Sequence, residues 1–272
     1  MLKSIFQQNS HIVIGAVHFP PLLGYPEFPG IKTSLKNSTQ DIKNFIAGGA
    51  PGVIMENNYD LPHQVNIPAG SLACLTYLAV KLRQSFPRLP LGISVLWNDY
   101  RAALSIAKIA DLSFIRIPVF VDTVKTACGI IKGQPDDVIR YRRQIKAEGV
   151  QIFTDIHVKH AKLLSRYSLA QSARLAIKKG SDALIITGSW TGDAPQTTDL
   201  AIARGAAGQH PILAGSGVNS KNITTILNYA NGVIVSTALK KGKVNKKLTN
   251  LTGWDQRIDS GKVKKLLSKL DY

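Results

Sequence analysis

Residues 211–219 have the sequence PILAGSGVN, and residues 232–237 have the sequence GVIVST. Each segment begins with an apolar run and ends in small or hydroxyl-bearing residues. A short continuous apolar run bounded by glycine, proline or aspartate is typical of a strand buried on both faces, as in a parallel sheet. The two segments therefore predict two such strands with polar loops at their carboxyl ends.

Six further apolar runs of the same kind precede these two. Amphipathic stretches alternate with the runs, and no linker or change of composition interrupts them. Such alternation predicts one α/β domain with a parallel sheet over residues 1–272, and eight units close a (β/α)8 TIM barrel. The predicted strands are residues 11–17, 52–55, 91–96, 112–117, 150–155, 183–187, 211–214 and 232–235.

Helical spacing predicts helices over residues 33–48, 71–85, 100–110, 136–148, 168–179, 220–229 and 260–270. Gly149 and Gly180 match the glycine signal at the end of a helix. An open doubly wound sheet is the alternative architecture. Its usual G-x-G-x-x-G motif is absent after the first strand, where residues 18–21 (HFPP) stand instead.

The chain is strongly basic. It has 272 residues, 44% of them hydrophobic, with 34 Lys and Arg against 17 Asp and Glu, a formal charge of +17. This excess predicts attraction to polyanions, anionic lipid headgroups or phosphorylated small molecules. Residues 240–272 alone contain ten basic and three acidic residues. We interpret this segment as the last helix with a solvated face, and a dedicated binding surface is the alternative.

Two cysteines far apart, Cys74 and Cys128, exclude a zinc finger and argue against a disulfide scaffold. No apolar run reaches the roughly 18 residues that a membrane span needs. Residues 1–10 lack the apolar region of a secretory signal. We therefore expect a cytoplasmic protein, with peripheral attachment to a membrane left open.

The loops after the seventh and eighth predicted strands indicate an anion site. Barrels of this type often bind phosphate there, and glycines allow backbone N–H groups and a helix N-terminus to approach the anion. Glycine turns alone would also explain the pattern. The predicted phosphate-binding residues are Gly215, Ser216, Gly217, Ser236 and Thr237.

Acid–base side chains follow the other predicted strands, where barrel enzymes place their catalytic groups. Alternation along a strand would aim Asp155 and His157 in the same direction. A carboxylate, an imidazole and an amine together suit proton transfer. The predicted catalytic residues are His18, Glu56, Asp99, Asp155, His157 and Lys159. The predicted substrate-binding residues are Asn57, Asn98, Arg116, His160, Thr187 and Thr191.

Structural roles are the alternatives for these residues. Arg116 would pair with a rim carboxylate, and Asn98 and Asp99 would cap the following helix. No motif requires a cofactor. Glu56, Asp155 and His157 could supply ligands to a divalent metal, but no spacing signature requires one.

Several segments in the right order resemble the BtpA/SgcQ family. They include residues 11–26 (HIVIGAVHFPPLLGYP), 155–161 (DIHVKHA), 183–192 (ALIITGSWTG) and 213–219 (LAGSGVN). The resemblance implies a barrel of the ribulose-phosphate-binding type. It also links the chain to a cyanobacterial factor for photosystem I accumulation, peripheral to thylakoid membranes, and to a branch found among sugar-metabolism genes. It supplies no catalytic mechanism.

The chain departs from the family pattern at three rim positions. The family usually has Val-Glu-Asn-Phe-Gly-Asp at residues 55–60 (MENNYD here), Arg-Asn-Asp at residues 97–99 (WND) and Asp-Gln-Gly at residues 127–129 (ACG). The resemblance therefore does not extend to a shared substrate specificity.

Two functions follow from these observations. The first is an enzyme, a lyase, isomerase or hydrolase, acting on a sugar phosphate or nucleoside phosphate. A Schiff base on Lys159 is the weaker mechanism, because a lysine beyond a strand end is a poorer candidate than one inside the barrel. The alternative is a non-catalytic biogenesis factor for a membrane complex of the photosystem I type, docked on anionic lipid or a partner. Specific nucleic-acid binding ranks last, since no recognition motif is present. Pairing of barrel faces into a homo-oligomer stays open.

Overall fold

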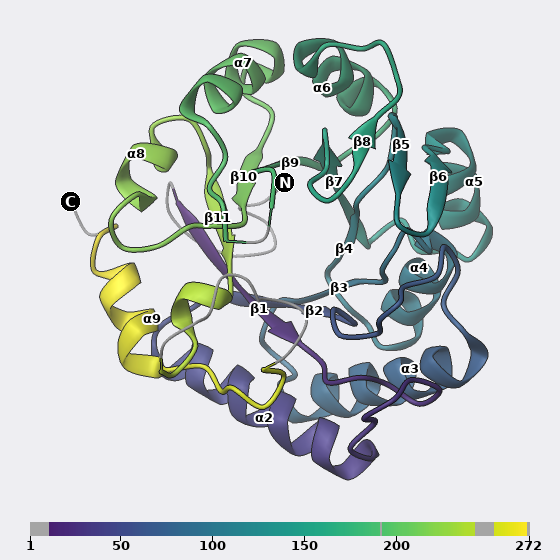
Figure 1. The fold of residues 1–272 in the computed structure, drawn as a ribbon, viewed down its shortest axis with the longest axis vertical. Coiled ribbons are helices and arrows are strands. Elements are labelled where there is room, and N and C mark those ends of the chain that lie inside the picture. The colour runs from purple at the N-terminus through teal and green to yellow at the C-terminus, as the bar shows by residue number, and fades with distance from the viewer. Residues whose placement is uncertain (1–10, 191, 243–252, 271–272) are drawn as a thin grey trace.

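Eight parallel strands close into a barrel in the computed structural model, which describes residues 11–190, 192–242 and 253–270. Their order is β1-β11-β10-β9-β7-β4-β3-β2, and Figure 1 looks onto their carboxyl ends. Each predicted run overlaps one barrel strand, so the predicted (β/α)8 barrel is confirmed. The strands are β1 (Ile12–His18), β2 (Gly52–Glu56), β3 (Leu91–Ser94), β4 (Phe114–Ile117), β7 (Gln151–Ile156), β9 (Ala183–Thr187), β10 (Ile212–Gly215) and β11 (Gly232–Val235).

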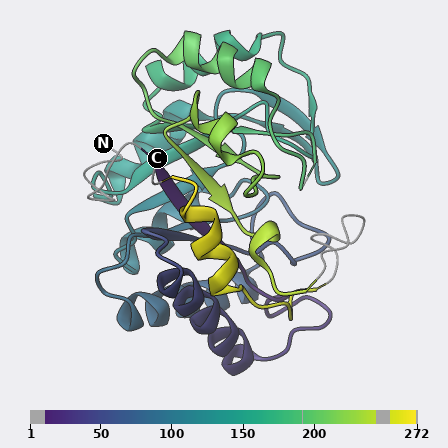
Figure 2. The same ribbon diagram turned by 90° about the vertical axis from the view of Figure 1, so that its left-hand side faces the viewer.

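Helices surround the barrel, as Figures 1 and 2 show from two directions. Helix α9 packs against α2 and so joins the end of the described chain to its beginning. None of the helices in the described residues is long and apolar enough to cross a membrane. The helices are α2 (Ile31–Ala47), α3 (Ala69–Ser85), α4 (Tyr100–Ile109), α5 (Pro135–Gln144), α6 (Leu169–Lys178), α7 (Thr197–Ala207), α8 (Ile223–Leu227), α9 (Ser260–Leu267) and the short 3-10 helix η1 (Thr237–Leu239).

Three helices differ from the prediction. Helix α7 was not predicted. Helix α8 is much shorter than residues 220–229, because the side chains of Asn219 and Asn222 fold the preceding segment into a turn. Helix α5 ends before Gly149, because Lys146 adopts a left-handed conformation and the Ala147 N–H donates to the Arg142 carbonyl.

The long segment between the fourth barrel strand and α5 contains a β-hairpin. Strands β5 (Thr123–Thr126) and β6 (Gly129–Lys132) pair antiparallel, and β8 (Lys162–Leu163) adds a third strand to β5. Val124 and Ile131 from this small sheet pack against Trp97 and Val158. The sheet therefore covers the loops that follow β3 and β7.

The barrel interior contains a layer of apolar side chains, followed by a layer of charged side chains nearer the carboxyl ends of the strands. Phe114 and Phe153 stack with ring centroids 4.6 Å apart, and a Cβ on Gly92 would collide with the Phe114 ring. Interior positions recur at every second residue along a strand. The next interior positions toward the carboxyl ends of β4 and β7 are Arg116 and Asp155, so the alternation that fills the core also positions a charged layer above it.

Candidate active site

Arg116 is the centre of the charged layer. Its Nε and Nη2 donate to the two carboxylate oxygens of Asp155 at 2.8 Å each, and its Nη1 donates to Glu56 Oε1 at 3.0 Å. All three side chains are nearly or fully buried. The carboxylates of Asp155 and Glu56 raise the pKa of Arg116 against the opposing effect of burial. A permanent cation thus stands between two carboxylates.

His18 lies beside Glu56 at the end of β1. Its Nε2 is 3.6 Å from Glu56 Oε2, and its buried Nδ1 has no hydrogen-bond partner among the described residues. Burial, together with the positive charges of Lys240, Lys159 and Arg116, holds the pKa of His18 well below its ordinary value. His18 is therefore held as a neutral imidazole.

Lys159 reaches the same site from the loop after β7. Its Nζ donates to Ser216 Oγ at 2.6 Å. Burial, and then the nearby Arg116 guanidinium, lowers the pKa of Lys159 to about 8, while Glu56 and Asp155 oppose this shift. An amine with this pKa carries a substantial neutral fraction near pH 7.5.

The loops after β10 and β11 present unpartnered hydrogen-bond groups. The N–H groups of Ser216, Gly217 and Thr237 donate to no acceptor within the described part of the chain. Ser236 Oγ is buried and likewise has no partner among those residues. Gly217 has a φ of 59°, and any Cβ there would collide with the Ala194 backbone, so no larger residue fits this turn.

The residues that carry these groups line one pocket of about 330 Å³ at the carboxyl end of the barrel. Ser216, Gly217, Ser236 and Thr237 line it on the β10–β11 side. His18, Glu56, Arg116 and Lys159 line it from β1, β2, β4 and the β7 loop. The pocket thus combines unpartnered donors that suit an anion with acid–base side chains.

A family model described as the BtpA family matches residues 9–271. The chain belongs to the BtpA family. It is 35% identical over 242 residues to the Photosystem I biogenesis protein BtpA of Synechocystis sp., over 88% of this chain and 84% of that protein. It is 31% identical over 281 residues to a mitochondrial protein of Caenorhabditis elegans, over 100% of this chain and 97% of that protein. The family resemblance found in the sequence is confirmed.

Solved structures similar to this BtpA-family protein are TIM barrels with little sequence similarity. The tryptophan synthase alpha subunit of Legionella pneumophila superposes with a TM-score of 0.60 at 11% identity, over 99% of this chain and 96% of that chain. Phosphoribosyl anthranilate isomerase of Thermus thermophilus superposes with a TM-score of 0.58 at 9% identity, over 95% of this chain and 98% of that chain. At such identities the similarity shows the fold alone.

Asp155 and His157 do not face the same way, contrary to the expectation from alternation. Strand β7 ends at Ile156, and His157 adopts a left-handed conformation with a φ of 51°. Its Nε2 lies 3.4 Å from the Ser172 hydroxyl on α6. Asp155 stays inside the barrel on Arg116. Alternation stops where the strand stops, so the two side chains diverge.

His157 and Thr187 line a neighbouring polar pocket of about 580 Å³. Lys159 and Gly217 line both pockets. The Thr187 hydroxyl accepts a hydrogen bond from the Lys159 backbone N–H at 3.3 Å. His160 contacts the Trp190 ring edge to face at 4.6 Å, beside this pocket rather than in it. Thr191 lies outside the described residues.

Six of the predicted site residues that the structure describes line neither pocket: Asn57, Asn98, Asp99, Asp155, His160 and Gly215. The side chain of Asn57 bonds to the Leu96 backbone and to Asp60. Asn98 bonds to both backbone groups of Val119. Asp99 accepts from the Ala102 N–H and so caps α4, which was the structural alternative for this residue.

Other residues line the first pocket without having been predicted, among them Asn58, Asn219 and Lys262. Asn58 lies two residues beyond the end of β2, so alternation along the strand does not set its direction, but its place just after a barrel strand is a signal that the sequence gives. Lys262 had no such signal, since its position depends on how the last helix packs.

The described residues include no group of three or more His, Cys, Asp or Glu side chains placed to hold a metal ion. Of the three metal ligands considered from the sequence, Glu56 and Asp155 bond to Arg116 and His157 lies elsewhere.

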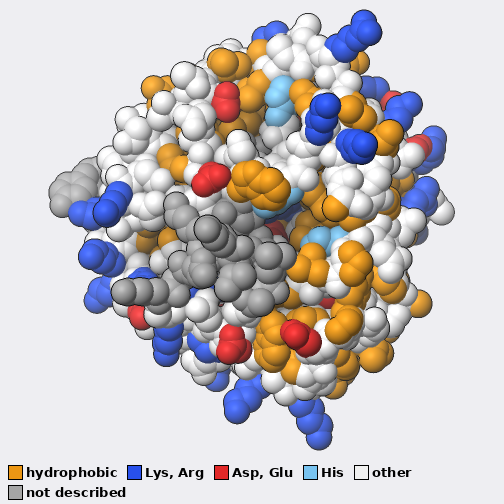
Figure 3. All heavy atoms as spheres, viewed as in Figure 1, with side chains coloured by type: hydrophobic (Ala, Val, Ile, Leu, Met, Phe, Trp, Pro, Cys, Tyr) orange, Lys and Arg blue, Asp and Glu red, His pale blue; other side chains and the backbone are white. Residues whose placement is uncertain are grey.

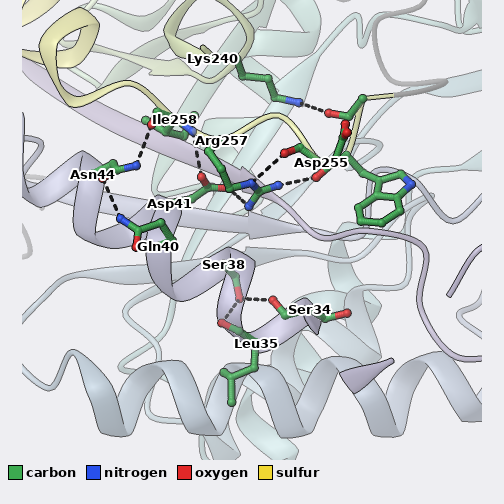
Figure 4. Close-up of polar contacts among 12 residues, drawn as sticks. Ser34, Leu35, Ser38, Gln40, Asp41, Asn44, Lys240, Asp255, Arg257 and Ile258 are labelled. Atoms are coloured by element: carbon green, nitrogen blue, oxygen red, sulfur yellow. Dashed lines mark hydrogen bonds and ion pairs between the residues drawn. The ribbon is translucent and has the colours of Figure 1, made fainter. Parts of the chain in front are cut away.

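The described part of the basic C-terminal segment borders the site. Figure 4 shows Arg257 and Ile258 meeting Asp41 of α2, with an Arg257 Nη1 to Asp41 Oδ2 distance of 2.7 Å and an Ile258 N to Asp41 Oδ1 distance of 2.9 Å. Lys240 is buried, with its Nζ 2.9 Å from the Tyr59 hydroxyl. Burial lowers the pKa of Lys240 to about 8. Figure 3 shows that Lys and Arg otherwise lie mostly around the periphery of this face.

Proposed function

We propose that the protein is an enzyme acting on a phosphorylated small molecule, a sugar phosphate or a nucleoside phosphate. One observation carries the proposal: the residues with unpartnered N–H groups after β10 and β11 and the buried acid–base residues line the same pocket. A structural neighbour named as an isomerase of a phosphoribosyl compound is consistent with this assignment. The reaction belongs with the lyases, isomerases or hydrolases, in the cytoplasm.

The geometry refines the roles that the sequence suggested. Ser216, Gly217 and Thr237 would hold the phosphate through backbone N–H groups, assisted by the Ser236 hydroxyl. Glu56 and His18 would exchange protons with the substrate, since both line the pocket. Asp155 would hold Arg116 in place rather than carry protons, because both of its oxygens accept hydrogen bonds from Arg116.

Ligand-induced stabilisation tests this proposal. The full chain would be melted with inorganic phosphate, sugar phosphates and nucleotides, alongside Ser216→Asp and the matched variant Ser85→Asp on the exposed end of α3. A ligand at a hundred times its dissociation constant adds about 2.7 kcal/mol to the free energy of unfolding. Wild type and Ser85→Asp should be stabilised by a phosphorylated compound, and Ser216→Asp should not. Equal stabilisation of all three, or of none, would contradict a phosphate site in this pocket.

A non-catalytic biogenesis factor is the second candidate, because the Synechocystis relative is named for photosystem I biogenesis. This role would use the basic surface, in peripheral contact with an anionic membrane or a membrane complex. Binding to anionic vesicles should then weaken strongly between 50 and 500 mM salt as surface charge is screened, on the order of tenfold or more. Such binding should be unaffected by Ser216→Asp.

A further inference from the structure

Lys159 stands where the anion loops meet the acid–base residues. Its Nζ lies 2.6 Å from the hydroxyl of Ser216, within the loop that offers its N–H groups to a phosphate. The residue follows β7 by three positions, which made it a poor candidate for covalent catalysis on sequence alone. The structure removes that objection, because the side chain turns back to line the pocket.

The surroundings of the amine favour its neutral form. The Nζ of Lys159 is surrounded by protein atoms. The residue as a whole is half-buried and lines the pocket. The fixed charge of Arg116 acts against a second cation, and it lowers the Lys159 pKa together with burial. A desolvated lysine next to another cationic group is a recognised way to obtain a nucleophilic amine at neutral pH.

We infer that Lys159 is a nucleophile that forms an imine with the carbonyl carbon of an aldehyde or ketone sugar phosphate. This inference rests on the proposed function, since the phosphate would be held by the loops after β10 and β11. A phosphate beside Ser216 lies next to the amine. A carbonyl only a few bonds from the phosphate ester would therefore reach Lys159, which favours short-chain sugar phosphates as the substrate class.

The step balances without any added reagent. The Lys159 ammonium gives one proton to Glu56, which lines the same pocket. The neutral amine attacks the carbonyl carbon, and the carbonyl oxygen takes up the electron pair of the broken π bond and a proton from Glu56. The nitrogen of this adduct then loses one proton, which is transferred to the new hydroxyl group. The hydroxyl group leaves as water while the nitrogen lone pair forms the C=N bond. One ammonium and one carbonyl thus give one protonated imine and one water.

Reductive trapping tests the inference on the full-length protein. The protein would be incubated with dihydroxyacetone phosphate or glyceraldehyde 3-phosphate and cyanoborohydride, then analysed by intact mass and peptide mapping. We expect one adduct, on Lys159, that inorganic phosphate suppresses and that unphosphorylated glyceraldehyde at equal concentration does not form. The rate of labelling should rise with pH and level off above about 8.

Two matched variants complete the test. Lys159→Arg keeps the charge but supplies no nucleophilic amine, so it should lose the adduct. Lys162→Arg, at an exposed position in β8, should keep it. Peptide mapping of the wild type decides the question even if Lys159→Arg does not fold. Labelling spread over exposed lysines, with phosphate-dependent stabilisation intact, would overturn the imine and leave the proposed function standing. No stabilisation by any phosphate compound, together with no trapped adduct, would overturn both.

Discussion

Arg116 and Asp155 form a double hydrogen bond inside the barrel, with two guanidinium nitrogens each 2.8 Å from a different carboxylate oxygen. The pair is buried, and Glu56 accepts a third hydrogen bond from the same guanidinium. Arg116 therefore positions Glu56 at the floor of the pocket. Removing one member of a buried pair costs much more than the pair contributes, because the remaining charge is uncompensated.

Asp155→Asn should lower the free energy of unfolding by about 2–4 kcal/mol at pH 7, because Arg116 would keep only Glu56 as an anionic partner. Urea denaturation monitored by circular dichroism measures this loss. Asp136→Asn is the matched control. Asp136 pairs with Lys179 on the surface, so its loss should cost less than about 1 kcal/mol. Equal losses in the two variants would show that the buried pair has no special role.

Gly217→Ala should weaken phosphate binding at least tenfold and lower the melting temperature, because its Cβ would push the loop away from Ala194. The left-handed φ adds strain for any other residue. Gly205→Ala in α7 is the control, since a Cβ there meets open space and alanine favours the helix by about 0.5–1 kcal/mol. Isothermal titration with the stabilising compound measures the binding. Unchanged affinity in Gly217→Ala would contradict a close approach of this backbone to the ligand.

Lys240 should make the protein more stable as pH rises from about 8 toward 10. Burial lowers its folded pKa to about 8 from an ordinary value of 10.5, so the unfolded chain binds more protons over this range. The free energy of unfolding then increases with pH. Lys159 contributes in the same direction. Lys240→Met should reduce the increase by about 1–3 kcal/mol, and the exposed Lys241→Met should leave it unchanged. Urea unfolding at pH 7.5, 8.5 and 9.5 provides the comparison.

Most of the barrel could be predicted from local sequence. Strands such as β9 and β11 are buried at every position and apolar except for Thr187 at the end of β9, and that pattern is set by burial on both faces. Helix α7 was not predicted because its buried face is short, with Leu200 and Ala203 as the buried residues. The β5–β6 hairpin was not predicted because the alternation of buried and exposed residues in each strand spans only four residues. The end of α5 was misplaced because Lys146, rather than a glycine, adopts the left-handed conformation.

Much of the site could be predicted from the position of residues at or just beyond the ends of strands. Glu56, Lys159, Ser216 and Gly217 were found in this way, and all four line the pocket. The Lys159–Ser216 contact joins residues 57 positions apart, and no local pattern encodes it. His157 was expected beside Asp155 because alternation was extended past the end of β7. The functions of residues beyond strand ends depend on loop conformation, which the sequence does not reveal by periodicity.

Arg257 should hold the C-terminal segment to α2 through Asp41. Burial raises the pKa of Asp41, and Arg257 acts to lower it. Arg257→Met would remove that opposing charge, so the folded variant would bind a proton on Asp41 more tightly than wild type does. Its stability should therefore fall further below wild type as pH rises from 4 to 7, reaching a deficit of about 1–3 kcal/mol. Lys264→Met, exposed on α9, should show no such trend. Urea unfolding at pH 4.5, 5.5 and 7 measures the difference. A deficit independent of pH would mean that Arg257 acts through its hydrogen bonds to the 254–255 backbone rather than through Asp41.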